Sequence, residues 1–309
     1  MTIVVAGYDE GDWASAWSND ASQALAPEDM SQAYILSDSR LSIGLGPHRR
    51  VVSDKAPKIE RIPVAVAQPL FTPDGYTTDR VESRYTCSCG LAYSGNEFLG
   101  RTVMDRFRRA AELFEYTWIS KTSTSEGHYA ICSSESPDAL RLSRTRYDRD
   151  LDFAHADLPP LPGLLLVESL RQQMQAAAND ILRREKENDR LDDYLRTRFV
   201  LGTVCHLNKK VELHDASYKR DASVDPPWLN AVVEKVDRDG LVVLGQEGWK
   251  PDLEVVRDGA RRARQQACGR MQLALKRCIA NAEPKNFVGG DIQVGILTVQ
   301  EGFSLTGMT

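Results

Sequence analysis

The second residue of the chain, Thr2, is the first whose type and place could do chemistry. A small second residue such as threonine generally permits removal of the initiator Met1, which would leave Thr2 at the N-terminus. A terminal threonine carries a nucleophile and a base together: its hydroxyl can attack a carbonyl while its free α-amine, with an ordinary pKa of about 7.7–8.0, accepts the proton. Many chains begin Met-Thr, so this residue alone predicts little.

Other catalytic templates are missing from the sequence. It contains no G-x-x-x-x-G-K-[ST] phosphate loop, no G-x-G-x-x-G, no H-E-x-x-H and no G-x-S-x-G nucleophile elbow. The five histidines are scattered, and of the six cysteines only Cys87 and Cys89 are close, in a C-x-C spacing that is not typical of zinc sites. We therefore expect reduced, mostly buried thiols, no metal and no cofactor.

The composition excludes several classes of protein. The chain has 309 residues, of which 42% are hydrophobic and 27% charged, as in an ordinary soluble protein with a sizeable core. Its net charge of -5 argues against a dedicated nucleic-acid or anionic-membrane binder. No run approaches the ~20 apolar residues of a membrane span, and no basic region precedes an apolar stretch at the N-terminus. A cytoplasmic protein is expected.

The elements that must position Thr2 can be read from hydrophobic spacing. A helix is predicted over 96–118, because Leu99, Val103, Phe107, Ala110 and Phe114 follow one helical face. Two more helices are predicted over 164–197 and 257–281. Apolar and β-branched runs predict strands at 2–7, 33–36, 61–67, 85–93, 199–206, 210–214, 230–236, 241–245 and 292–299.

This order of elements predicts one α+β domain over residues 1–309. Two antiparallel sheets between helix layers would cover every apolar face. Asp239-Gly240 predicts a hairpin turn between the strands at 230–236 and 241–245. The polar segments at about 9–32 and 121–163 are expected to be insertions.

Four short segments carry a resemblance to a known family. They are Ser37-Asp38-Ser39-Arg40, Lys58-Ile59 before a strand, Ser94-Gly95-Asn96 before a helix, and a terminal strand introduced by Gly289-Gly290. Together they resemble the proteasome β-subunit family of N-terminal nucleophile (Ntn) hydrolases, which includes the bacterial HslV and Anbu branches. The resemblance covers 2–118 well and 285–303 moderately, and 121–285 only in element order. It implies a four-layer αββα sandwich.

The resemblance also implies a role for each matching residue. Thr2 would be the nucleophile, and Lys58 the internal cation that keeps the hydroxyl and amine pKa values low. Asp38 would pair with Lys58, and Arg40 would support the Asp38 turn. Gly95 would donate its backbone N–H to the tetrahedral oxyanion. Lys55 is the rival for the lysine role, and Lys58 is preferred because it directly precedes the apolar start of a strand.

The sequence departs from the family pattern around the amine. The usual Gly-Ser-Gly turn is replaced by Gly245-Gln246-Glu247-Gly248, and Lys285, Asn286 and Val288 stand where an Asp and a Ser are expected. Two functions therefore stay open. The first is a proteasome-like threonine amidohydrolase or peptidase that acts on a peptide or protein, assembles as a homo-oligomeric ring or spiral and works with an unfoldase. The second is a catalytically inactive subunit that serves as an assembly or binding scaffold.

Overall fold

A computed structural model of the chain describes residues 2–9, 32–43, 50–71, 77–119, 128–133, 160–184, 191–221, 228–263, 265–282 and 288–306. The expected insertion at 9–32 lies outside these residues except at its two ends. Of the expected insertion at 121–163, the described part is a strand at 128–133 and the residues from 160 onward. Among the described residues, no helix is long and apolar enough to cross a membrane.

A five-stranded antiparallel sheet contains the start of the chain. Its strand order is β12-β1-β2-β13-β14, so β1, the strand that follows Thr2, is an interior strand with a partner on each side. The strands run over Leu241–Leu244 (β12), Val4–Asp9 (β1), Gln32–Asp38 (β2), Ile292–Thr298 (β13) and Gly302–Thr306 (β14). Every residue of β1 is buried, because both faces of this sheet are covered.

A seven-stranded sheet has the order β11-β10-β9-β6-β5-β7-β8. All its neighbours are antiparallel except β5 and β7. Its strands are Trp228–Lys235 (β11), Lys210–Asp221 (β10), Arg198–Cys205 (β9), Thr77–Ser94 (β6), Ile59–Phe71 (β5), Phe114–Ile119 (β7) and His128–Ser133 (β8). A separate pair, Leu41–Ile43 (β3) and Arg50–Ser53 (β4), forms a two-stranded sheet.

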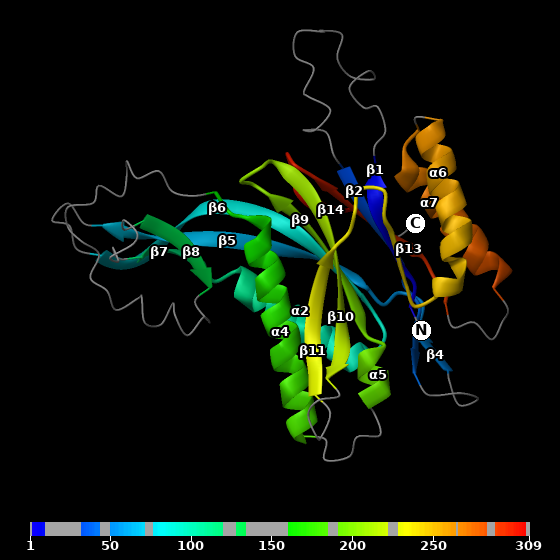
Figure 1. Cartoon of the computed structure of the whole chain (residues 1–309), viewed down its shortest axis with the longest axis horizontal. Helices are drawn as coiled ribbons and strands as arrows, with labels where there is room; N and C mark the ends of the chain where they lie inside the picture. Colours follow the sequence, from blue (N-terminus) through cyan, green and yellow to red (C-terminus); the bar gives the residue numbers. More distant parts are fainter. Residues whose placement is uncertain are drawn as a thin grey trace, which may run out of the picture.

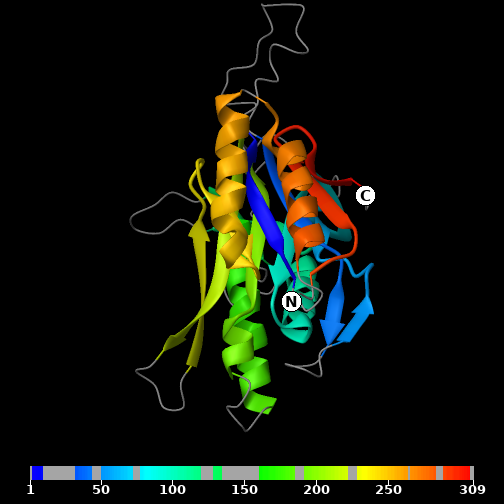
Figure 2. The same cartoon turned by 90° about the vertical axis from the view of Figure 1, so that its right-hand side faces the viewer.

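The helices lie on the outer faces of the two large sheets (Figures 1 and 2). They are Glu97–Ala111 (α2), Gly163–Arg184 (α4), Leu191–Leu195 (α5), Lys250–Arg262 (α6) and Ala267–Asn281 (α7), with a 3-10 turn at Glu247–Trp249 (η3). The N-terminus of α2 is fixed locally, because the Asn96 side chain accepts a hydrogen bond from the Leu99 N–H at 3.0 Å.

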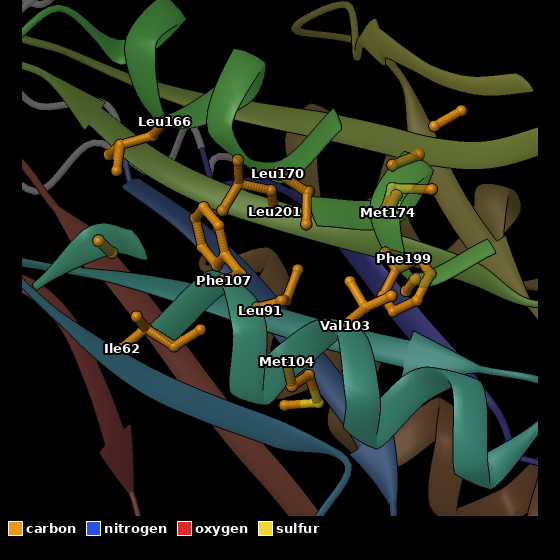
Figure 3. Packing of buried hydrophobic residues seen from close by; sticks show 14 of the residues in the cluster. Ile62, Leu91, Val103, Met104, Phe107, Leu166, Leu170, Met174, Phe199 and Leu201 are labelled. Carbon is orange, nitrogen blue, oxygen red and sulfur yellow. The ribbon is translucent and has the colours of Figure 1, made fainter. Parts of the chain in front are cut away.

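Three apolar clusters hold these elements together. The first joins α2 and α4 to one face of the seven-stranded sheet, with Phe107, Leu170 and Phe199 among its members (Figure 3). The second packs α6 and α7 on the five-stranded sheet. The third lies between the two sheets and joins residues such as Val4 and Ile35 to Val200. The chain is therefore an α+β protein, as predicted.

Two predicted helices were wrong in extent. The helix predicted over 96–118 ends at Ala111, and Phe114–Ile119 is a strand. Phe114 is buried in that strand, and because it also falls at helical spacing from Ala110, the apolar pattern did not show where the helix ends. The helix predicted over 257–281 is two helices, because α6 ends at Arg262 and the backbone restarts at Ala267. The helix predicted over 164–197 is described as α4 and the short α5, with 185–190 outside the described residues.

The predicted hairpin at Asp239-Gly240 was also wrong. A turn is present, since the Gly240 N–H donates to the Asp237 carbonyl at 2.8 Å. However, the strand before it belongs to the seven-stranded sheet and the strand after it pairs with β1 in the other sheet. This turn therefore carries the chain from one sheet to the other.

Candidate active site

The candidate residues come together at one end of the two large sheets. Thr2 precedes β1, Asp38 ends β2, and Lys58 precedes β5, while Ser94 ends β6 and Gly245 follows β12. Antiparallel pairing places the start of each strand beside the end of its neighbour. The register pairs Val4 with Ser37 on one side and with Leu244 on the other, so both partner strands end beside Thr2.

The backbone of Thr2 is held from two directions. The Ser94 hydroxyl donates to the Thr2 carbonyl at 2.7 Å, and the next N–H, that of Ile3, donates to Asp38 Oδ1 at 2.9 Å. Gly245 approaches so closely that a Cβ there would lie 1.8 Å from the Thr2 carbonyl oxygen, and its φ of +86° also favours glycine. Thr2 itself is 5% exposed. Its position is therefore set by residues at the ends of β6 and β2 and by the close approach of the residue after β12.

Asp38 is a fully buried carboxyl group whose two oxygens accept backbone hydrogen bonds. Oδ1 accepts from Ile3, and Oδ2 accepts from the Gly289 N–H at 3.1 Å. Burial raises the pKa of Asp38 to about 7, although these hydrogen bonds and the charge of Lys58 act to lower it. Asp38 thus connects the start of β1 to the start of β13 and can change its charge near neutral pH.

Lys58 is buried, with 1% exposure, whereas its rival Lys55 is exposed. Its ammonium is 2.6 Å from Glu97 Oε2 and lies 5.3 Å from the centre of the Tyr93 ring. The expected direct ion pair with Asp38 is therefore wrong: the ion-pair partner is Glu97, and both Asp38 oxygens are taken by backbone N–H groups. The charge of Lys58 still acts on Asp38 through space.

Arg40 ties the end of β2 to the start of β13. Its Nε donates to Asp54 Oδ1 at 2.6 Å, and its backbone N–H donates to the Gly289 carbonyl at 3.0 Å. Its guanidinium occupies the space of a Gly289 Cβ, which would lie 2.5 Å from Arg40 Cζ. Arg40 therefore braces the same two segments that Asp38 joins.

Gly95 lies between Ser94, which bonds Thr2, and the N-cap of α2. Its φ is +122°, and a Cβ would lie 2.6 Å from Thr197 Cα, so only glycine fits. The next N–H, that of Asn96, donates to Thr197 Oγ1 at 3.0 Å. The peptide at Gly95 is thus held rigidly within one residue of the Thr2 contact.

Anbu proteins are among the solved structures to which this chain is similar. An Anbu (Gly-1) mutant from Hyphomicrobium sp. strain MC1 matches with a TM-score of 0.48 and 10% identity, over 100% of this chain and 86% of that one. Anbu (ancestral beta-subunit) from Yersinia bercovieri matches with a TM-score of 0.45 and 10% identity, over 99% of this chain and 87% of that one. A third match, from Pseudomonas aeruginosa, is described as a helical assembly of the Anbu complex, with a TM-score of 0.45, 10% identity and coverage of 99% and 86%.

No protein-family profile and no curated protein matches the sequence. At 10% identity, no residue role is carried over from the Anbu structures.

The departures from the family pattern can be placed in part. Gly245 of the altered turn lies against Thr2. Glu247 of the same turn accepts a hydrogen bond at Oε1 from Arg198 Nη1, at 2.7 Å. Val288 is buried, and its carbonyl oxygen accepts a hydrogen bond from Arg40 Nη1 at 3.5 Å. Lys285 and Asn286 lie outside the described residues.

Three site residues were missed in the sequence. Ser94 was part of a recognised motif but had no role, and Glu97 stands two residues beyond Gly95. Gln293 accepts hydrogen bonds from the Lys58 and Ile59 N–H groups at 2.6 and 3.3 Å. Nothing local marks Gln293, because its partners are more than two hundred residues away. Among the described residues, no group of His, Cys, Asp and Glu side chains could hold a metal ion.

Proposed function

We propose that the chain is a proteasome β-subunit-like Ntn hydrolase of the Anbu type, in which Thr2 cleaves an amide bond once it is the N-terminal residue. The supporting observation is the fixed position of Thr2, held by Ser94, Asp38 and Gly245 at the end of three strands. We also propose that the two sheets and their helices form the four-layer αββα sandwich of that family, as one domain.

In the proposed reaction, the Thr2 hydroxyl attacks the substrate carbonyl and passes its proton to the α-amine. The amine then gives this proton to the leaving amine as the C–N bond breaks, which leaves an ester at Thr2 Oγ. Water hydrolyses the ester and restores Thr2. The Gly95 N–H is the proposed oxyanion donor, and loss of such a donor typically costs about 10²–10³ in rate.

The buried charges support this assignment. A cation near an amine makes the amine less basic and keeps it free to accept a proton. Lys58 supplies that cation, and Asp38 and Arg40 hold the backbone around it. Peptides or proteins are the proposed substrates, delivered by an unfoldase to a homo-oligomeric ring or spiral in the cytoplasm.

The experiment that tests the proposal combines intact mass with a covalent probe. The mass of the protein from its native host reports whether Met1 has been removed, and a peptide epoxyketone or β-lactone should then add to Thr2. Thr2→Ala should abolish both the adduct and amidase activity, while Thr102→Ala, a threonine on α2 that bonds the Phe98 carbonyl, should change neither.

Three results would contradict the catalytic proposal. They are retention of Met1, an adduct on a cysteine, or full turnover by Thr2→Ala. A processed, folded and assembled protein that reacts with neither probe nor substrate would instead support the scaffold role, and native mass spectrometry of the same sample would report the assembly.

A further inference from the structure

The Lys58 ammonium is paired with a carboxylate that the family pattern did not predict. Glu97 is the first residue of α2, and its Oε2 lies 2.6 Å from Lys58 Nζ. The two residues differ in burial, since 2% of the Lys58 side-chain surface is exposed, against 35% for the Glu97 side chain. The charge of Lys58 is thus neutralised from the solvent side of the site.

Glu97 is itself fixed and ionised. Arg101 donates from Nε to its other oxygen at 3.1 Å, and the N-terminus of a helix favours a negative charge. Burial acts against ionisation, but the hydrogen bonds from Lys58 and Arg101, together with the positive charge of Lys58, hold the pKa of Glu97 below its ordinary value. Glu97 therefore stays charged at neutral pH and holds Lys58 as an ion pair.

The backbone around Lys58 is fixed independently of this ion pair. Gln293 accepts the Lys58 N–H at 2.6 Å, and Arg101 donates from Nη2 to the Pro57 carbonyl at 2.8 Å. Removing the Glu97 charge would therefore free the ammonium end of Lys58 and weaken one contact of Arg101, which keeps its bonds to Glu60 and to the Pro57 carbonyl. This separation makes the electrostatic role of Glu97 measurable without loss of the fold.

We propose that Glu97 is a positioning residue that holds the Lys58 ammonium and limits how much of its positive charge reaches Asp38 and Thr2. The hold on Lys58 rests on its 2.6 Å contact with Glu97, and the effect on Asp38 rests on the charge of Lys58 acting on that carboxyl group; the effect on turnover rests on the proposed function. A negative charge next to Lys58 offsets its field at any site beyond it. Neutral Glu97 would leave Asp38 under a stronger positive field, which favours its ionised form.

The charged groups around this pair are few among the described residues. Three side chains face Glu97. Lys58 comes from the segment before β5, Tyr93 from β6, and Arg101 from α2, the helix that carries Glu97 itself. Asp38 is influenced by the Lys58 charge and by the backbone N–H groups that bond it. A substitution at Glu97 should therefore reach Asp38 chiefly through Lys58.

The test is a carbon-13 NMR titration of the Asp38 carboxyl in the full chain, assigned by comparison with Asp38→Asn. Glu97→Gln keeps the size of the side chain and removes its charge, and we expect the Asp38 midpoint to fall by about half to one pH unit. Glu60→Gln is the matched control: it also removes a carboxylate bonded to Arg101, at 3.0 Å, but one that does not touch Lys58. It should leave the midpoint within about 0.2 units.

A second variant separates loss of the charge from any general disturbance of the fold. Glu97→Asp keeps the charge but draws it back by one methylene, so its midpoint should lie between wild type and Glu97→Gln. An unchanged midpoint in Glu97→Gln, or an equal fall in Glu60→Gln, would overturn the proposal. If the protein is an amidase, the acidic limb of its kcat profile should also move to lower pH in Glu97→Gln, because a stronger positive field at Thr2 lowers the pKa of the α-amine that accepts the proton. If it is not an amidase, the titration still decides the role of Glu97.

Discussion

At the scale of single residues, burial separates two neighbouring lysines. Lys58→Ala should lower the free energy of unfolding by about 2–3 kcal/mol, somewhat less than the 3–5 kcal/mol typical of breaking a buried pair, because Glu97 is partly exposed and keeps Arg101. Lys55→Ala, at an exposed position, should change it by no more than about 0.5 kcal/mol. Urea unfolding of both variants measures the difference in the free energy of unfolding. Equal losses would contradict the assignment of Lys58 as the buried, ion-paired lysine.

Asp38 gives the site a dependence of stability on pH. Its pKa is raised to about 7 by burial, so between about pH 4 and pH 7 the folded chain binds this proton more tightly than the unfolded chain. The contribution of Asp38 to the free energy of unfolding therefore falls as pH rises through this range, by up to about 1.4 kcal/mol per unit.

Asp38→Asn should remove this fall, since the amide does not ionise. Asp54→Asn, at an exposed carboxylate that bonds Arg40, should keep it. Denaturant unfolding from pH 4 to pH 8 gives the three slopes, and identical slopes for wild type and Asp38→Asn would contradict the assignment.

At the scale of elements, the start of α7 depends on a distant strand. Asp9, at the end of β1, accepts hydrogen bonds from the Ala267 and Cys268 N–H groups at 2.9 and 3.2 Å, while the N-cap residue Gln266 makes no side-chain cap. Asp9→Ala should cost about 1–2 kcal/mol of stability, as loss of a helix cap does. Asp252→Ala, exposed in the first turn of α6, is the control, and calorimetry that finds equal melting temperatures for the two would argue against this cap.

At the scale of the whole molecule, one aromatic ring sets how closely the two sheets approach. The Phe303 ring of β14 fills the space of the missing side chains of Gly90 and Gly295, where a Cβ would lie 2.2 and 2.1 Å from it. Gly90→Ala should therefore cost about 1–3 kcal/mol through overpacking. Gly259→Ala on α6, where nothing lies within 4 Å of the added carbon, should be neutral or stabilising.

A double-mutant cycle can test whether the loss of stability in Gly90→Ala comes from contact with Phe303 between the two sheets. Phe303→Leu makes room beside Gly90, so the double variant should be more stable than the sum of the two single losses predicts. Strict additivity would mean that the ring and the glycine do not share this space.

The sequence by itself determined the features that depend on near neighbours. The spacing from Leu99 to Phe107 predicted which face of α2 is buried, because helical faces are set within a few residues. The predicted start at 96 lies one residue before the first residue of α2, Glu97. The order of strands and helices predicted an α+β fold, and the short motifs around Thr2, Asp38, Lys58 and Gly95 predicted residues that the fold brings to one end of its sheets.

Only the tertiary structure decided the rest, since contacts across the chain depend on distances that local patterns do not contain. The break before α7 is stabilised by Asp9, and the turn at Gly240 changes sheets because β12 finds its partner in β1. The partner of Lys58 is Glu97, because the start of α2 places that carboxylate 2.6 Å from the ammonium, while the Asp38 oxygens accept hydrogen bonds from two backbone N–H groups. A buried charge takes the partner that the folded chain places within reach, and that choice exists only once the strands have assembled.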